Sequence, residues 1–261
     1  MRARWALPMR SRPFACLLAL ALISCGGCGG GRSGKPNLSV AAAASLRTAF
    51  LNYGPDFRRA NVHFSFGGSD LLAAQIEVGV RPDVFAAADT ALPERLYARG
   101  LIEKPSAFAA NQLVLAVPAG SKKVNSLGDL EKAGVSLAIG SPAVPVGAYT
   151  RAVLGRLGAG LSSAVLGHVR SQEPDISGIV GKLTQGAVDA GFVYLTDVKA
   201  SRGRLHAILL PRRSHPTATY SAGVVRGSAH PALARRFILG LLSGPGRRAL
   251  LGAGFRPARS R

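Results

Sequence analysis

Ser45 lies at a junction in the sequence that suits the binding of an anion. The preceding residues 38–44 are apolar, as in a short strand buried on both faces, and the following residues are apolar at helical spacing. As the N-cap of such a helix, Ser45 would lie beside N–H groups that have no partner within the helix. An anion can bind at such a place. Since most capping serines bind no ligand, other segments must support this role.

The sequence gives little support to metal or redox chemistry. All three cysteines (Cys16, Cys25 and Cys28) lie near the N-terminus, so the rest of the chain is predicted to contain no disulfide and no thiolate ligand. The five histidines lack the spacing of paired metal ligands; they are His63, His168, His206, His215 and His230. We expect no free metal cation and no cofactor.

Catalysis by a serine nucleophile is a remote alternative. Residues 67–71 read GGSDL, which lacks the second glycine of a nucleophile elbow around Ser69. An exported hydrolase that used Ser69 or Ser45 would also need a base and an orienting acid. We therefore predict that the protein is not an enzyme and has no catalytic residues.

The N-terminal residues have the pattern of a bacterial export signal. Four arginines precede the apolar residues 14–23, a run too short to span a membrane. Residues 22–25 (LISC) resemble a lipoprotein box, which predicts a signal peptide over residues 1–24 and lipid attachment at Cys25. Residues 25–36 would form a Gly-rich tether. We expect an exported protein, lipid-anchored on the outer face of the cytoplasmic membrane (periplasmic or cell-surface); an ordinary cleaved signal is the alternative.

The chain is strongly basic, with a formal net charge of +20. Residues 1–24 contain four arginines and no acidic residue, so their removal leaves +16. Export, scattered basic residues and an aromatic content of only 6% argue against a nucleic-acid partner. We expect a basic surface that attracts anions and anionic lipid, although an arginine-rich codon bias would give the same composition.

Strands and helices are predicted to alternate along the chain, without an internal sequence repeat. Strands are expected at residues 38–44, 62–66, 82–88, 111–117, 135–139, 190–194, 205–210 and 220–225. Helices are expected at residues 46–60, 70–78, 126–130, 149–157, 176–185 and 230–242, after Asp89, and as a last turn before Phe255. Asp83 and Asp89 are interpreted as turn or capping residues. This alternation predicts an α/β fold with a parallel sheet.

Five segments, taken in order, resemble the molybdate-binding subunit of bacterial ABC importers. They are the AAASL segment at residues 42–46, Ser69 with LAAQIEVG at 72–79, DVFAAAD at 83–89, VPVGAY at 144–149 and DAGFVY at 189–194. No single segment is specific, but their order and spacing together are. The resemblance extends over residues 38–255.

The resemblance implies the type II periplasmic binding protein fold. In this fold two α/β lobes, each a mostly parallel sheet flanked by helices, are joined by two crossing strands and hold the ligand in a cleft. Lobe I would comprise residues 37–112 and 218–257, and lobe II residues 113–217. Residues 258–261 would form a frayed tail. A permease, its ATPase and a monomeric receptor are implied as well.

The resemblance also implies the ligand and its contacts. Molybdate or tungstate would be held by the hydroxyl and N–H groups of Ser45 and Ser69, the N–H groups of Val146 and Ile176, and the Tyr194 hydroxyl. Such neutral donors suit a fully ionised tetrahedral dianion, because a protonated phosphate would bring a hydroxyl without an acceptor, at a cost of about 1–3 kcal/mol. Four helix N-termini could balance the charge. Sulfate or another small oxyanion remains the alternative, because only cavity size separates it from molybdate.

Alternative interpretations remain for Asp70 and for three of the ligand positions, Val146, Ile176 and Tyr194. Asp70 is expected to turn its carboxylate to solvent in the first turn of its helix, whereas in the cleft it could accept a proton from a protonated oxyanion. The short loop before Val146 allows a slip of one residue, and Ile176 is placed only by counting back from Tyr194. Tyr194 could instead be a strand-end aromatic residue that covers the core.

Overall fold

We describe residues 34–214 and 217–258 of a computed structural model of the chain. Signal-peptide and lipid-attachment predictions fall on residues outside this part. Residues 35–261 form one compact unit. Within the described ranges, no helix combines the length and the apolar character needed to cross a membrane.

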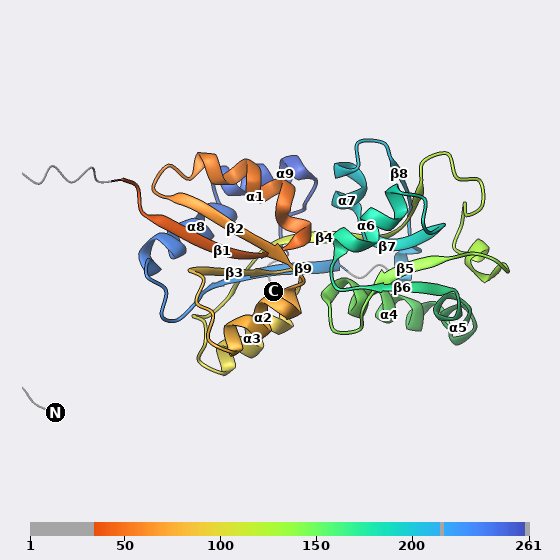
Figure 1. The fold of residues 1–261 in the computed structure, drawn as a ribbon, viewed down its shortest axis with the longest axis horizontal. Coiled ribbons are helices and arrows are strands. Elements are labelled where there is room, and N and C mark those ends of the chain that lie inside the picture. The colour runs from red at the N-terminus through yellow and green to blue at the C-terminus, as the bar shows by residue number, and fades with distance from the viewer. Residues whose placement is uncertain (1–33, 215–216, 259–261) are drawn as a thin grey trace, which may run out of the picture. The chain divides into compact units, whose positions relative to one another are not determined.

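Nine strands form a continuous sheet in the order β2-β1-β3-β9-β4-β7-β5-β6, with β8 paired to β4 (Figure 1). The strands are β1 (Asn37–Ala43), β2 (Asn61–Gly67), β3 (Val84–Ala87), β4 (Ser106–Pro118), β5 (Leu137–Gly140), β6 (Val169–Glu173), β7 (Ala190–Tyr194), β8 (Leu205–Ile208) and β9 (Thr217–Val224). The pairs β1–β2, β1–β3, β5–β6 and β5–β7 are parallel. The predicted two-lobed α/β fold is confirmed.

Two strands, β4 and β9, connect the lobes (Figure 1). The first half of β4 pairs with β9 up to Gln112, and from Leu113 onward β4 pairs with β7. This change of partner occurs within one uninterrupted strand, which is why β4 is longer than the predicted strand at residues 111–117. Asn111, at the crossing point, is buried.

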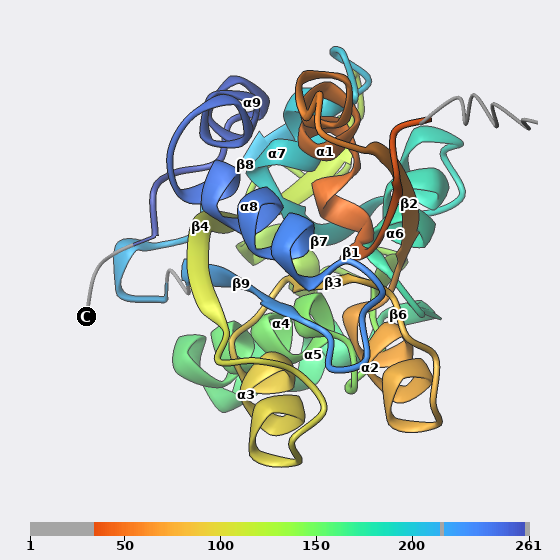
Figure 2. The ribbon, with the colours of Figure 1, turned by 90° about the vertical axis from the view of Figure 1, so that its left-hand side faces the viewer.

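Helices cover both faces of the sheet in lobe I (Figure 2). They are α1 (Arg47–Tyr53), α8 (Pro231–Leu242) and α9 (Pro245–Ala253) on one face and α2 (Ser69–Glu77) and α3 (Ala91–Ala98) on the other. The side chains of β1 and β3 alternate between these layers: Val40 and Val84 pack with the first, Ala41 and Phe85 with the second. Burial on both faces explains why these strands are apolar throughout.

Lobe II repeats this layered arrangement around β5, β6 and β7. The helices α4 (Pro145–Leu157) and α5 (Ala159–Gly167) lie on one face, and α6 (Ile176–Thr184) and α7 (Leu195–Ala200) on the other (Figure 1). The sequence pattern did not predict β6, α5 and α7. The strand β6 lies at the edge of the sheet and its side chains are partly or fully exposed, so it lacks the apolar signal of a buried strand.

The helix predicted at residues 46–60 is wrong in length. A 3-10 turn (Ala44–Leu46) precedes α1, and a second 3-10 turn (Gly54–Asp56) follows it. Pro55 provides no N–H group to continue the ladder of α1. The chain then turns back toward β2.

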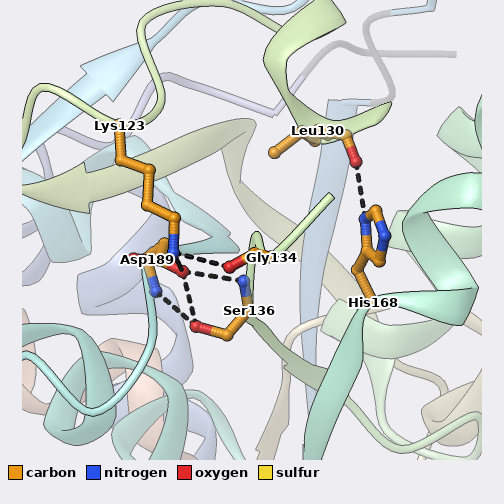
Figure 3. Close-up of polar contacts among 6 residues, drawn as sticks. All are labelled: Lys123, Leu130, Gly134, Ser136, His168 and Asp189. Carbon is orange, nitrogen blue, oxygen red and sulfur yellow. Dashed lines mark hydrogen bonds and ion pairs between the residues drawn. The ribbon is translucent and has the colours of Figure 1, made fainter. Parts of the chain in front are cut away.

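Each lobe contains a serine–aspartate clamp at the starts of its central strands, at the ends that lie away from the lobe–lobe junction. In lobe I the Asp83 carboxylate accepts hydrogen bonds from the Ser39 N–H (2.7 Å) and hydroxyl (2.8 Å). In lobe II Asp189 accepts from the Ser136 N–H (2.8 Å) and hydroxyl (2.7 Å) and from Lys123 (2.8 Å), as Figure 3 shows. Both aspartates therefore join the starts of neighbouring strands, whereas the sequence pattern predicted a local turn or capping residue at Asp83.

Candidate functional site

All five predicted ligand residues line one small cavity of about 20 Å³ between the lobes. Its walls are formed by Ala43, Ala44, Ser45, Gly67, Gly68, Ser69 and Ala88 of lobe I and by Val146, Asp175, Ile176 and Tyr194 of lobe II. Among these described residues there is no lysine or arginine. As it stands, this space is about the size of one water molecule, far below the roughly 300–1,000 Å³ of sites that hold drug-sized organic ligands.

A larger groove of about 290 Å³ opens nearby. It contains only Ser45 and Ile176 of the five predicted residues, and its walls include the charged side chains of Arg47, Asp197 and Arg204. The small cavity, where donors from both lobes converge, is therefore the candidate site.

Three helices, α2, α4 and α6, begin at the cavity, and a 3-10 turn lies beside them. Ser69 and Ile176 are the first residues of α2 and α6, and Val146 is the second residue of α4. Pro145 occupies the first position of α4 and has no N–H, so Val146 supplies the first donor of that helix. Ser45 lies in the 3-10 turn before α1. These N–H groups have no partner within their helices and carry partial positive charge.

The prediction that Ser45 is an N-cap is wrong. It lies within the 3-10 turn, whose N-cap is Ala43, and the Ser45 hydroxyl is 2.9 Å from the Tyr220 hydroxyl. The reason is that β9 brings a buried tyrosine next to Ser45, and this long-range hydrogen bond replaces the local cap. Ser45 still lines the cavity.

Ser69 has one hydroxyl hydrogen available for the cavity. Its oxygen accepts a hydrogen bond from the Ala88 N–H at 3.1 Å, and its side chain is buried. Since the oxygen is engaged as an acceptor from the β3 end, the hydroxyl is oriented to donate. The DVFAAAD segment thus positions Ser69 from the adjacent strand.

The Tyr194 hydroxyl is buried and has no hydrogen-bond partner among the described residues. Tyr194 is 1% exposed, ends β7 and lines the cavity. Burial, followed by the neighbouring tyrosines Tyr220 and Tyr149, raises its pKa well above the ordinary value, which keeps the hydroxyl protonated. A buried donor without a partner lowers the stability of the protein unless a ligand accepts a hydrogen bond from it.

Tyr220 and Asn111 belong to the hydrogen-bonded group that includes Ser45, and neither residue was predicted from the sequence. Burial raises the pKa of Tyr220 well above the ordinary value, whereas hydrogen bonds with Ser45 and Asn111 oppose this rise. Asn111 also donates to the Thr196 hydroxyl of lobe II at 2.8 Å. Both residues lie on the crossing strands, far in sequence from Ser45, so no local pattern could have identified them.

Most carboxylates near the cavity either accept hydrogen bonds from backbone N–H groups or have a raised pKa, which favours the neutral form. Asp175 caps α6 by accepting from the N–H groups of Ser177 (2.7 Å) and Gly178 (3.2 Å). Burial raises the pKa of Asp89 to about 6 and that of Asp197 to about 7. Both shifts reduce the negative charge that would oppose a bound anion at mildly acidic pH.

Asp70, expected to turn its carboxylate to solvent, does so only in part, because the residue is half-buried. Its Oδ1 atom is buried without a hydrogen-bond partner among the described residues, although Asp70 is not part of the cavity wall. The cause is the close approach of the lobes at this point. An added Cβ at Gly68 would lie 2.8 Å from this oxygen and 2.4 Å from the carbonyl oxygen of Pro174 in lobe II.

Metal chelation by side chains finds no geometric basis in residues 34–214 and 217–258. No group of three or more His, Cys, Asp or Glu side chains in these ranges is placed to hold a metal ion. His168, for example, bonds through Nδ1 to the Leu130 carbonyl at 2.9 Å (Figure 3). The cavity chemistry is that of hydrogen-bond donation.

Comparison with known proteins identifies the family. A family model described as bacterial extracellular solute-binding protein matches residues 38–256. The molybdate-binding protein ModA of Mycobacterium tuberculosis is 32% identical over 253 residues, which cover 92% of this chain and 95% of that protein.

Solved structures match over most of the chain. The periplasmic molybdate-binding protein of Azotobacter vinelandii has a TM-score of 0.76 at 22% identity, covering 85% of this chain and 100% of that one. The sulfate-binding protein SubI of M. tuberculosis has a TM-score of 0.77 at 18% identity, covering 85% and 87%. The chain thus belongs to the bacterial extracellular solute-binding proteins, in the group that includes the molybdate-binding protein ModA, and has the type II periplasmic binding protein fold.

Proposed function

We propose that this protein is the receptor of an ABC importer, and that it captures molybdate, and tungstate as well, in the cavity between its lobes. The observation that carries the proposal is the set of neutral donors from both lobes. Ser45, Ser69, Val146, Ile176 and Tyr194 would donate to the oxyanion, and lobe closure would complete the cage. The receptor performs no chemistry and delivers its ligand to a permease that an ATPase drives.

The donor set favours a dianion that carries no proton. Every group proposed to face the ligand donates, so each ligand oxygen can accept hydrogen bonds. A protonated phosphate would leave its own hydroxyl unpaired, at a cost of about 1–3 kcal/mol. Three helix N-termini, each equivalent to roughly half a positive charge, would oppose most of the charge of a dianion.

We further propose that export and anchoring follow the N-terminal pattern. Residues 1–24 would be removed, Cys25 would carry lipid, and residues 25–36 would tether a monomeric body outside the cytoplasmic membrane. In this body, residues 37–112 and 218–257 are proposed as lobe I, residues 113–217 as lobe II and residues 258–261 as the tail. Mass spectrometry of the membrane-extracted protein would detect the lipid on the N-terminal cysteine, and a Cys25→Ser chain would be released in soluble form.

An anion competition titration tests the function. Calorimetry with molybdate, tungstate, sulfate and phosphate should give tight one-to-one binding of the first two and weak or no binding of phosphate. The proposal fails if sulfate binds and neither molybdate nor tungstate does. Sulfate also offers only acceptors, so its rejection would have to come from the size of the cavity.

Removing single donors tests the site. Ser45→Ala and Ser69→Ala are each expected to weaken molybdate binding by about 1–3 kcal/mol, because each removes a hydrogen bond to a charged ligand. Ser65→Ala, on β2 outside the cavity wall, is the matched control. Wild-type affinity in both site variants would refute the assignment.

Tyr194→Phe has a distinct expected signature. The variant should bind molybdate more weakly by about 1–3 kcal/mol, yet the ligand-free protein should be as stable as the wild type or more stable. The reason is that the Tyr194 hydroxyl is buried without a partner among the described residues. Urea unfolding with and without molybdate measures both effects, and a loss of stability in the ligand-free variant would contradict the role.

A further inference from the structure

Basic residues are distributed unequally between the two helical layers of lobe I. Residues 47–59 and 231–256, which form the layer of α1, α8 and α9, contain eight arginines, no lysine and one acidic residue. Residues 69–99, which include α2 and α3 on the opposite face, contain three arginines and five acidic residues. The positive charge of lobe I is therefore concentrated in the layer of α1, α8 and α9, which Figure 2 shows on one side of the sheet.

Most of these arginines are exposed and free of ion pairs within the described residues. Arg235 pairs with Glu103, and Arg47 stacks on Phe66 at 4.5 Å from its ring centre. Arg256 donates to the Gln112 side chain at 3.1 Å. The exposed arginines that have neither an ion pair nor another such side-chain contact among the described residues are Arg58, Arg59, Arg236, Arg247 and Arg248. An external polyanion could bind them.

Exposed leucines accompany the arginines on the same helical faces. Leu239 is 58% exposed and lies three residues after Arg236 on α8. Leu251 is 43% exposed and lies three and four residues after Arg248 and Arg247 on α9. Residues at these spacings share one face of a helix. Arginine beside an exposed apolar side chain is the pattern of an interfacial membrane contact.

We propose that the α1–α8–α9 face of lobe I docks on the surface of a membrane that contains anionic phospholipid. The headgroups would bind Arg58, Arg59, Arg236, Arg247 and Arg248, and Leu239 and Leu251 would enter the interfacial region. Lobe I also follows the N-terminal segment directly: only 11 residues lie between Cys25 and Asn37, a reach of at most about 40 Å. This docking is independent of which anion the cavity holds.

Vesicle binding tests the proposal. Residues 35–261 form one compact unit, and the A. vinelandii match covers 100% of that solved chain, so this body can be studied alone. It should sediment with vesicles that contain roughly one-third phosphatidylglycerol, and binding should be lost in about 0.5 M salt. Equal binding to pure phosphatidylcholine vesicles would overturn the proposal.

Charge removal on the face gives the decisive comparison. The triple variant Arg236→Gln, Arg247→Gln, Arg248→Gln should bind the anionic vesicles about 100-fold more weakly, since each arginine contributes about five-fold. A control with Lys122→Gln, Arg156→Gln and Arg170→Gln removes three exposed charges from lobe II. Both variants should bind molybdate like the parent. An equal loss of vesicle binding in the two variants would overturn the proposal, because binding would then depend only on net charge.

A single tryptophan can report insertion. The only tryptophan of the chain is Trp5, so residues 35–261 contain none. Leu251→Trp should show a blue shift of fluorescence with anionic vesicles, whereas Leu166→Trp, at a 41% exposed position on α5 of lobe II, should not. A blue shift confined to the Leu166 position would place the membrane contact on lobe II and refute the proposal.

Discussion

Adding one methyl group at Gly68 is expected to lower the affinity for the oxyanion about 5- to 150-fold, as for a steric penalty of about 1–3 kcal/mol. Gly68 has ordinary backbone angles (φ −60°, ψ 134°), so alanine can adopt them. The new Cβ would however lie 2.4 Å from the Pro174 carbonyl oxygen on the opposite lobe. The lobes would have to separate to relieve this contact.

Calorimetry with molybdate and urea unfolding of the ligand-free protein distinguish this effect from misfolding. Gly68→Ala should bind weakly and unfold like the wild type, because the shortest contact is with the opposite lobe and the other, 2.8 Å from Asp70 Oδ1, is with the end of a side chain that can turn away. Gly155→Ala is the matched control, since no atom lies within 4 Å of its added Cβ. Wild-type affinity of Gly68→Ala would mean that the lobes need not approach this closely to hold the ligand.

Removing the Asp83 carboxylate is expected to lower the free energy of unfolding by about 3–5 kcal/mol. The side chain is 4% exposed and accepts hydrogen bonds from Ser39, from the Ser228 hydroxyl (2.6 Å) and from the His230 N–H (3.2 Å). In Asp83→Ala these buried donors lose their acceptor. Urea unfolding at neutral pH measures the loss, and Asp56→Ala, at an exposed carboxylate on the same lobe, is the control.

The same clamp should make stability depend on pH in the acid range. Burial raises the pKa of Asp83, but hydrogen bonds from Ser228, Ser39 and His230 outweigh this effect and bring the pKa below its ordinary value. A lowered pKa in the folded state contributes stability above the unfolded value of about 3.9, which is lost as pH falls through the folded pKa. As the pH falls from about 5 to about 2, Asp83→Ala should therefore lose less free energy of unfolding than the wild type. Parallel losses would contradict this.

The core strands of the fold could be predicted from the sequence because they are buried on both faces. Residues 38–44, 135–139 and 190–194 read as short apolar runs, and the structure has β1, β5 and β7 there. The elements that were missed, such as β6 and α5, are largely exposed and have mixed composition. The pattern of apolar residues therefore predicted the buried strands but not the exposed elements at the edges of the fold.

The candidate site could be predicted only in part for a related reason. Its five donors lie at the ends of strands or the starts of helices, where sequence segments are distinctive. The Ser45–Tyr220 hydrogen bond joins residues 175 positions apart, and the contact between Gly68 and Pro174 also depends on how the lobes meet. Such contacts arise from tertiary packing, which no local pattern encodes, and this explains why the expected cap at Ser45 was wrong.

The two serine–aspartate clamps show that the two lobes share one structural arrangement. In lobe I Ser39 lies near the start of β1 and Asp83 precedes β3, as Ser136 and Asp189 precede β5 and β7 in lobe II. At the cavity, lobe I presents the 3-10 turn of Ser45 and the start of α2, and lobe II presents the starts of α4 and α6. The halves thus face each other as approximate equivalents, although their sequences show no repeat. A tetrahedron has two-fold axes, so a tetrahedral ligand can offer two oxygens to each half, which a planar anion with three oxygens cannot do.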